Sequence, residues 1–210
     1  MIDHRIRVRL FVVIIICLIV GNAGAFEHKR GTTSVGGQIL LGAIEGSSEW
    51  RDHFSEGMGV TFSVRHSFAR NRAYGVSFEQ QRFQRIRGLD KKEGLPYYYD
   101  ADDLEFQSLL LDYYFYFQRK NRRTPYLIIS AGLYRPQIII EITDETGTAG
   151  DHVKFPSENV IGRIGVGYEY FIKRNFSIDS RISGYYLNGT EGGTSVTGQI
   201  AIGVHLYVSH

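Results

Sequence analysis

The sequence predicts an all-β protein that folds as an eight-stranded antiparallel up-and-down transmembrane β-barrel. Three observations predict it: long segments in which apolar and polar residues alternate, connections that alternate between short and long, and an N-terminal segment typical of exported proteins. The composition agrees with this class. The 210 residues include 24 Gly, 14 Tyr and 13 Phe but a single Cys, a balance that favours β-structure.

Residues 1–25 have the three parts of a cleavable signal peptide. Three arginines precede Leu10–Val20, an unbroken apolar run of 11 residues, and a small-residue A-x-A site ends at Ala25. A helix needs about 20 apolar residues to span a bilayer, so the run is too short for an anchor. Cleavage after Ala25 would leave 26–210 as a single barrel domain. That domain has 21 basic and 21 acidic residues, so its charge does not favour a nucleic-acid partner.

Eight segments alternate with the period of two that is typical of β-strands. In the last segment, Ile200 and Val204 fall on one face and Gln199 and Ala201 on the other. Pro136 interrupts the fifth segment, where we expect a bulge or the departure of the strand from the sheet. The predicted strands cover 33–45, 57–68, 73–87, 105–118, 125–141, 159–172, 176–187 and 195–208.

The connections between these segments are of two kinds. Short turns are expected near 70–72, 119–124 and 173–175, and long loops at 46–56, 88–103, 142–158 and 188–194. Short turns at one end and long loops at the other are typical of barrels in the bacterial outer membrane. Strands inside a bilayer must close into a ring, because every backbone group there needs a partner.

The composition of the two faces indicates which of them points outward. The polar face is rich in Gly, Ser, Thr and Ala, which suits the narrow interior of an eight-stranded barrel. The alternative is a secreted lipocalin-like binder, in which the apolar face points inward. Aromatic residues near the short turns favour the membrane barrel, because they are expected to form an interfacial girdle: Phe68, Tyr74, Tyr113, Phe115, Phe117, Tyr126, Tyr168, Tyr170 and Phe176.

The chain resembles the small outer-membrane barrels of the OmpA transmembrane domain and of the OmpX/Ail type. The resemblance rests on the predicted architecture and on the last strand, and it covers essentially all of 26–210. The segment that begins at Gly203 and continues through Leu206 and Val208 is similar to the C-terminal assembly signal of such barrels, although it ends in His210 and lacks a terminal Phe. The resemblance implies an outer-membrane location. It also implies contact with outer-membrane lipid and lipopolysaccharide, and folding by the barrel assembly machinery.

We expect the polar face to place charged side chains inside the barrel. Buried charges persist only when they are paired, so we interpret these residues as a network that neutralises itself and closes the lumen. A channel for small solutes is the alternative. The expected register puts Glu169 opposite Arg181 and makes Arg65 a diagonal neighbour of Glu79. The predicted network consists of Arg65, Glu79, Asp112, Arg163, Glu169, Asp179 and Arg181.

The histidines and serines do not predict an enzyme. Small barrels that modify lipid A use a His and a Ser two residues apart, or a His with an Asp-Ser pair. Here His66 is adjacent to Ser67, and His205 has Tyr207 at the required spacing. We therefore expect no catalytic residue, no metal site and no cofactor. A lipid A-modifying enzyme stays a lesser alternative.

The two predicted ends of the barrel differ in charge. The long loops sum to −9 and the short turns to +8. One interpretation is that these charges only solvate the ends. The other is that the acidic loops have an adhesive or surface-interaction role, in which they engage a basic partner or the divalent cations of lipopolysaccharide. Exposed aromatic residues in these loops are the candidates for such contacts: Trp50, Tyr97, Tyr98 and Tyr99.

Overall fold

The computed structural model describes seven parts of the chain: 30–45, 54–85, 98–117, 122–143, 149–154, 159–190 and 193–208. The predicted signal peptide lies outside these residues. Within the described parts, no helix has the length and apolar character needed to cross a membrane.

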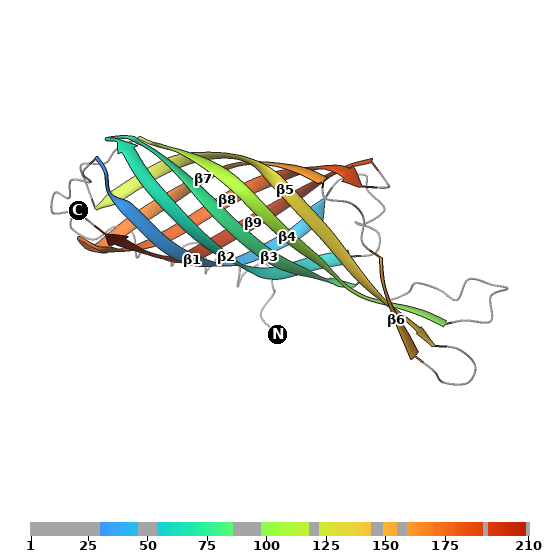
Figure 1. Cartoon of the computed structure of the whole chain (residues 1–210). Helices are drawn as coiled ribbons and strands as arrows, with labels where there is room; N and C mark the ends of the chain where they lie inside the picture. Colours follow the sequence, from blue (N-terminus) through green and yellow to red (C-terminus); the bar gives the residue numbers. More distant parts are fainter. Residues whose placement is uncertain are drawn as a thin grey trace, which may run out of the picture.

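The described residues form nine strands, all paired antiparallel (Figure 1). Eight of them close into a barrel in the order β4-β3-β2-β1-β9-β8-β7-β5, and pairing of β4 with β5 completes the ring. The predicted eight-stranded antiparallel barrel is confirmed. The strands are β1 (Thr33–Glu45), β2 (Phe54–Ala69), β3 (Arg72–Arg85), β4 (Tyr98–Tyr116), β5 (Arg123–Thr143), β6 (Ala149–Lys154), β7 (Asn159–Lys173), β8 (Phe176–Thr190) and β9 (Gly193–Val208).

The register of the strand pairs fixes the shear of the barrel. From Leu133 on β5, successive partners lead through Leu109 on β4 and Gly37 on β1, then back to β5 at Arg123. The path returns ten residues away from its start, so the shear number is ten. With eight strands this shear tilts the strands by about 40° from the barrel axis.

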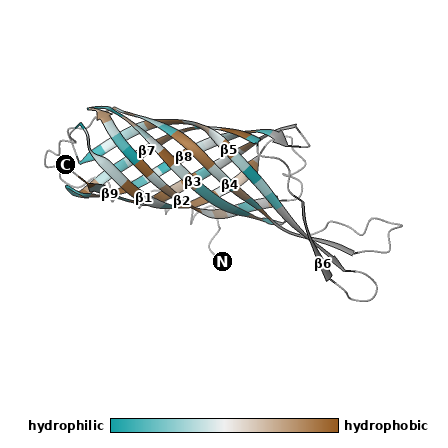
Figure 2. Cartoon of the chain, in the orientation of Figure 1, coloured by the Kyte–Doolittle hydropathy of each residue, from teal (hydrophilic) through white to brown (hydrophobic). Residues whose placement is uncertain are grey.

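The apolar face of every barrel strand points outward. Hydrophobic and hydrophilic residues alternate in colour along the strands (Figure 2). On β9, Ile200 and Leu206 are about half exposed, whereas Gln199 and His205 are buried. This arrangement is the reverse of a lipocalin, whose apolar side chains fill the interior. The barrel therefore presents an apolar outer wall and encloses a polar interior.

Most of the predicted aromatic girdle lies on this outer wall near the short turns. Tyr74 is 54% exposed and Phe117 is 61% exposed, and the ring of Phe68 lies 5.8 Å from that of Tyr74. Tyr126 is the exception, because it is only 1% exposed and points into the barrel. Its neighbours Pro125 and Leu127 take the outward positions, so the alternation along β5 decides its orientation.

Two barrel strands, β4 and β5, continue beyond the barrel at the long-loop end, where β6 joins them. β5 pairs with β7 up to Tyr134 and with β6 from Ile138 onward, so Pro136 lies where β5 leaves the barrel. The strand continues through Pro136 without a bulge, because a residue without an N–H is tolerated where the hydrogen-bonding partner changes. β4, β5 and β6 form a three-stranded sheet that projects from the barrel (Figure 1). The predicted loops 88–103 and 142–158 are therefore partly strand.

Candidate functional site

The interior of the barrel is filled in layers along its axis. At the long-loop end, ten buried residues form an apolar cluster that includes Phe54, Phe83, Leu104 and Phe106. Toward the short-turn end, a second cluster contains Tyr114, Tyr116 and Tyr126. The polar residues of the interior lie between these clusters and beside the second one. Here we call the buried charged residues and their hydrogen-bonding partners the interior network.

The structure places all seven predicted charged residues inside the barrel, and none of them is more than 4% exposed. They come from five different strands of the wall, because the alternation along each strand aims every second side chain inward. The seven residues are Arg65 on β2, Glu79 on β3, Asp112 on β4, Arg163 and Glu169 on β7, and Asp179 and Arg181 on β8.

Arg163 is the centre of the first part of the interior network. Its guanidinium contacts the carboxylates of Glu79 and Asp112, and its Nε donates to Ser130 Oγ at 3.0 Å. A second arginine, Arg181, lies 3.1 Å from Glu79 Oε1. Two arginines thus share two carboxylates, and β7 and β8 are held to β3 and β4 across the lumen.

Neutral side chains complete the hydrogen bonding of this first part. Tyr185 donates from its hydroxyl to Glu79 Oε2 at 2.8 Å, and Ser77 donates to Asp112 Oδ2 at 2.8 Å. Gln199 links Tyr185 to Gln81, whose Oε1 accepts from Gln199 Nε2 at 3.1 Å. Buried carboxylates are stable only with such additional donors.

Asp179 is the centre of the second part. It accepts from Arg65 Nη1 at 2.9 Å, from Gln38 Nε2 at 2.7 Å and from the Tyr126 hydroxyl at 2.8 Å. The Arg65 guanidinium lies 4.4 Å from the centre of the Tyr114 ring, which adds a cation–π contact. Strands β1, β2, β5 and β8 are therefore joined through one carboxylate.

Glu169 differs from the other three acidic residues. Ser177 Oγ donates to Glu169 Oε1 at 2.5 Å, and the Tyr207 hydroxyl donates to the same oxygen. Among the described residues, no arginine or lysine lies within ion-pair distance of it. Asp179 is its register partner on β8, so two carboxylates face each other on the inner wall.

Two of the expected pairings are wrong. Arg181 lies opposite Gly167, and Glu169 lies opposite Asp179. The turn is centred between Arg174 and Asn175, and a register shift between Phe171 and Lys173 displaces the β7–β8 pairing by one further residue. Arg65 lies opposite Gly75, and it contacts Asp179 instead of Glu79.

The β2–β3 error has the same cause. The turn is centred between Arg70 and Asn71, and a register shift between His66 and Ala69 displaces the pairing by one further residue, so Glu79 pairs with Thr61, four residues away from Arg65. The centre of each short turn and the irregularity next to it therefore decide both pairings, and alternation reveals neither of them.

The interior network contains partners that sequence reasoning did not select. Gln38, Tyr126, Tyr185 and Gln199 are neutral, whereas the predicted network consists of charged residues alone. Alternation does place Gln199 on the inner face, so the available signal was an inward polar residue of any kind. The apolar cluster at the long-loop end was also missed, because its members are large apolar residues on the inward face, where the predicted pattern called for polar ones.

The loop candidates are only partly covered by the structure. Trp50 and Tyr97 lie outside the described residues. Tyr98 and Tyr99 belong to β4 and pair with Thr143 and Ile142, so their placement in a loop was wrong. The strand extends this far because β5 continues beyond the barrel and offers it a partner.

His66 and His205 lie on opposite sides of the barrel wall. His205 lies 3.9 Å from Asp179, and neither of its ring nitrogens has a hydrogen-bond partner. His66 is on the outer side, with its Nδ1 3.0 Å from Thr33 Oγ1. The described residues contain no group of three or more His, Cys, Asp or Glu side chains that could hold a metal ion.

A cavity of about 10 Å³ lies between the apolar cluster and the interior network, lined in part by Glu79, Phe106 and Tyr185. That volume is close to the minimum for a single water molecule. The filled interior is thus chemically suited to hold the wall together.

Comparison with known proteins places this architecture among outer-membrane barrels. No protein-family model and no curated protein matches the sequence. Among solved structures, the chain is similar to Neisserial surface protein A, with a TM-score of 0.61 and 14% identity over 84% of this chain and 99% of that one.

Two further structures show the same likeness. Ail, the attachment invasion locus protein of Yersinia pestis, gives a TM-score of 0.53 and 15% identity over 86% of this chain and 100% of that one. The outer membrane protein OprG of Pseudomonas aeruginosa gives a TM-score of 0.51 and 13% identity over 88% of this chain and 99% of that one. The chain has the fold of these small barrels.

Proposed function

We propose that the chain is a non-enzymatic protein of the bacterial outer membrane, exported through a cleaved signal peptide, with a structural or surface-interaction role at its long-loop end. One observation carries the membrane location: a closed ring of strands exposes large apolar side chains around its outside. Leu111, Ile164 and Ile182 are each at least 60% exposed. A wall of this kind is stable in lipid and would aggregate in water.

Heat-modifiability tests this location. The chain is expressed in a Gram-negative host, the outer-membrane fraction is purified, and gel mobility is compared with and without boiling. A closed barrel resists the detergent and migrates faster before boiling. A chain that stays in the periplasm and shows no mobility shift would contradict the proposal.

The projecting sheet and the acidic loops support a role in surface interaction. β4, β5 and β6 extend beyond the barrel as a sheet whose last strand, β6, pairs on one side only among the described residues. The segments predicted as long loops, which include part of this sheet, sum to −9. Such a surface favours a basic protein or the divalent cations between lipopolysaccharide molecules.

The structural comparison offers a useful contrast. Ail has been solved in complex with sucrose octasulfate, a heparin analogue. The net negative charge of the long loops makes a polyanion an unfavourable ligand for this chain. We therefore expect cells that display the protein to bind cationic surfaces, and not heparin-like ones.

The aromatic candidates can be tested by substitution in this assay. Trp50→Ala and the triple replacement of Tyr97, Tyr98 and Tyr99 by Ala are compared with the parent chain, and gel mobility verifies folding. Loss of binding in these variants supports an adhesive surface, because buried aromatic residues dominate most interfaces. Binding that survives both changes would remove these residues from the proposal.

A small-solute channel is the second candidate, and the filled interior weighs against it. The lumen is bridged by Arg163, Asp112 and Glu79, and the apolar cluster lies between them and the long-loop end. Planar-bilayer recordings separate the two functions. We expect no steady conductance, and discrete reproducible openings would favour the channel.

A further inference from the structure

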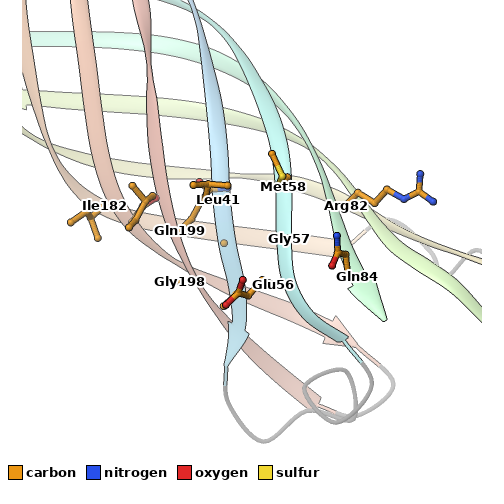
Figure 3. Close-up of a pocket in the computed structure, with 13 residues that line it drawn as sticks. Leu41, Glu56, Gly57, Met58, Arg82, Gln84, Ile182, Gly198 and Gln199 are labelled. Carbon is orange, nitrogen blue, oxygen red and sulfur yellow. The ribbon is translucent and has the colours of Figure 1, made fainter. Parts of the chain in front are cut away.

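The outer wall carries a groove near the long-loop end of β1, β2 and β9 (Figure 3). Its volume is about 660 Å³, within the range of sites that bind organic ligands. Leu41, Met58, Ile182 and Ile200 form its apolar side, and each of them is about half exposed or more. Glu56, Arg82 and Gln84 line its other end.

The groove exists because a row of outward positions lacks large side chains. Ala43 on β1 is the register partner of Gly198 on β9, which in turn pairs with Gly184 on β8. A Cβ atom added at Gly198 or Gly184 would meet nothing within 4 Å. Outward rows along a strand are about 7 Å apart, so this row leaves space about one hydrocarbon chain wide.

The tilt of the strands gives the groove a direction in the membrane. Each step from one strand to the next along this row descends toward the short-turn end by about 3 Å. The row begins at Glu56 on β2, passes Ala43 and Gly198, and reaches Gly184 on β8. Its polar end is therefore the end nearest the long loops, and its apolar end lies deeper in the outer wall.

We propose that this groove binds an acyl chain of a phosphate-bearing membrane lipid, with the lipid phosphate at the Arg82 end. The apolar side buries methylene groups, each of which contributes about fourfold to affinity. The Arg82 guanidinium and the Gln84 amide can donate hydrogen bonds to phosphate oxygens, and Glu56 can accept from headgroup hydroxyls. The inference rests on the proposed membrane location.

Photo-crosslinking in bilayer nanodiscs tests the proposal. The folded chain is reconstituted with phosphatidylglycerol that carries a diazirine in its acyl chain, and labelled residues are mapped by mass spectrometry. We expect labels to concentrate at Leu41, Ile182 and Ile200. Labels spread evenly over the outer wall would show ordinary annular lipid and overturn the inference, although the membrane location would stand. A chain with no label on its wall and no heat-dependent mobility would overturn both.

Matched variants separate the groove from the rest of the wall. Gly198→Leu fills the row where there is open space, and it should reduce labelling in the groove at least fourfold. Gly162→Leu is the control, because Gly162 is also an unobstructed glycine but does not line the groove. Ala43→Leu provides a second filling variant on the neighbouring strand. Unchanged labelling in both folded filling variants would overturn the proposal.

Two further comparisons test the identity of the occupant. Arg82→Gln should weaken labelling by phosphatidylglycerol but not by a diacylglycerol with the same diazirine chain, because only the first has a phosphate. Equal effects on both probes would overturn the phosphate assignment. Labelling by a free diazirine fatty acid but not by the phospholipid would overturn the assignment of a phospholipid as the occupant. Crosslinks between two copies of the chain at Gly198 would also overturn it.

Discussion

Glu169 and Asp179 face each other across β7 and β8 inside the barrel, yet within the described part of the chain only Asp179 has an arginine partner. Two buried carboxylates at register positions would repel each other if nothing offset their charges. Arg65, Gln38 and Tyr126 all donate to Asp179, whereas Glu169 accepts from two hydroxyl groups. The two residues therefore contribute differently to the interior network.

Asp179→Asn should destabilise the barrel far more than Glu169→Gln. The first change leaves the buried Arg65 guanidinium without its carboxylate, which costs about 3 kcal/mol or more. The second removes no ion pair among the described residues and should cost about 1 kcal/mol. Urea unfolding in lipid vesicles, followed by the fraction of the fast-migrating band, measures both free energies of unfolding. Equal losses would show that Arg65 does not depend on Asp179.

Arg163→Met should be more damaging than Arg181→Met. Arg163 contacts both Glu79 and Asp112, so its loss leaves two carboxylates with fewer partners, at a cost of about 3 to 5 kcal/mol. Among the described carboxylates, Arg181 contacts Glu79 alone, at 3.1 Å, and Glu79 keeps Arg163 when Arg181 is replaced. The midpoint of heat-induced loss of the folded gel band ranks the variants. The reverse order would contradict the central position of Arg163.

Tyr126→Phe should lower the free energy of unfolding by about 1 kcal/mol, because it removes the hydroxyl that donates to the buried Asp179. Tyr74→Phe is the matched control on the outer wall, where the side chain is 54% exposed, and its effect should be small. The same urea titration serves both variants. A girdle position for Tyr126 would instead make the two changes equivalent.

Gly132→Ala should impair folding, whereas Gly184→Ala should be tolerated. A Cβ atom at Gly132 would lie 2.0 Å from the backbone oxygen of Leu109 on the adjacent strand, which cannot move without breaking the β4–β5 pairing. A Cβ atom at Gly184 meets open space. The yield of heat-modifiable protein after refolding into detergent micelles compares them. Normal refolding of Gly132→Ala would mean that the two strands can separate locally.

Alternation predicted most of the fold because it depends only on neighbouring residues. The parity of Arg163 or Asp112 along its strand is enough to place it inside, and the structure places it there. The partners of these residues were not predictable in this way. They depend on register shifts such as those beside Lys173 and Ala69, which arise from turn geometry and not from hydropathy.

The position of Tyr126 along the barrel axis did not predict whether its side chain points inward or outward. Closeness to a short turn suggested the girdle, but the turn end of the barrel has an inner as well as an outer face. Parity with Leu127, which points outward, would have placed Tyr126 correctly. The extension of β4 and β5 was missed for a different reason, because strands beyond the barrel have no closed ring to impose a hydropathy pattern.

The shear of ten imposes a condition on how the barrel can form. The register offsets of all eight strand pairs must add up to one total before the last pair can join, so a slip by one residue in any hairpin is carried to the point of closure. A slipped pair would also turn inner side chains outward and expose the interior network to lipid. An error of register in one strand pair therefore affects the whole barrel. We expect that an intermediate with one incorrectly paired hairpin cannot close and must unfold before it can pair again.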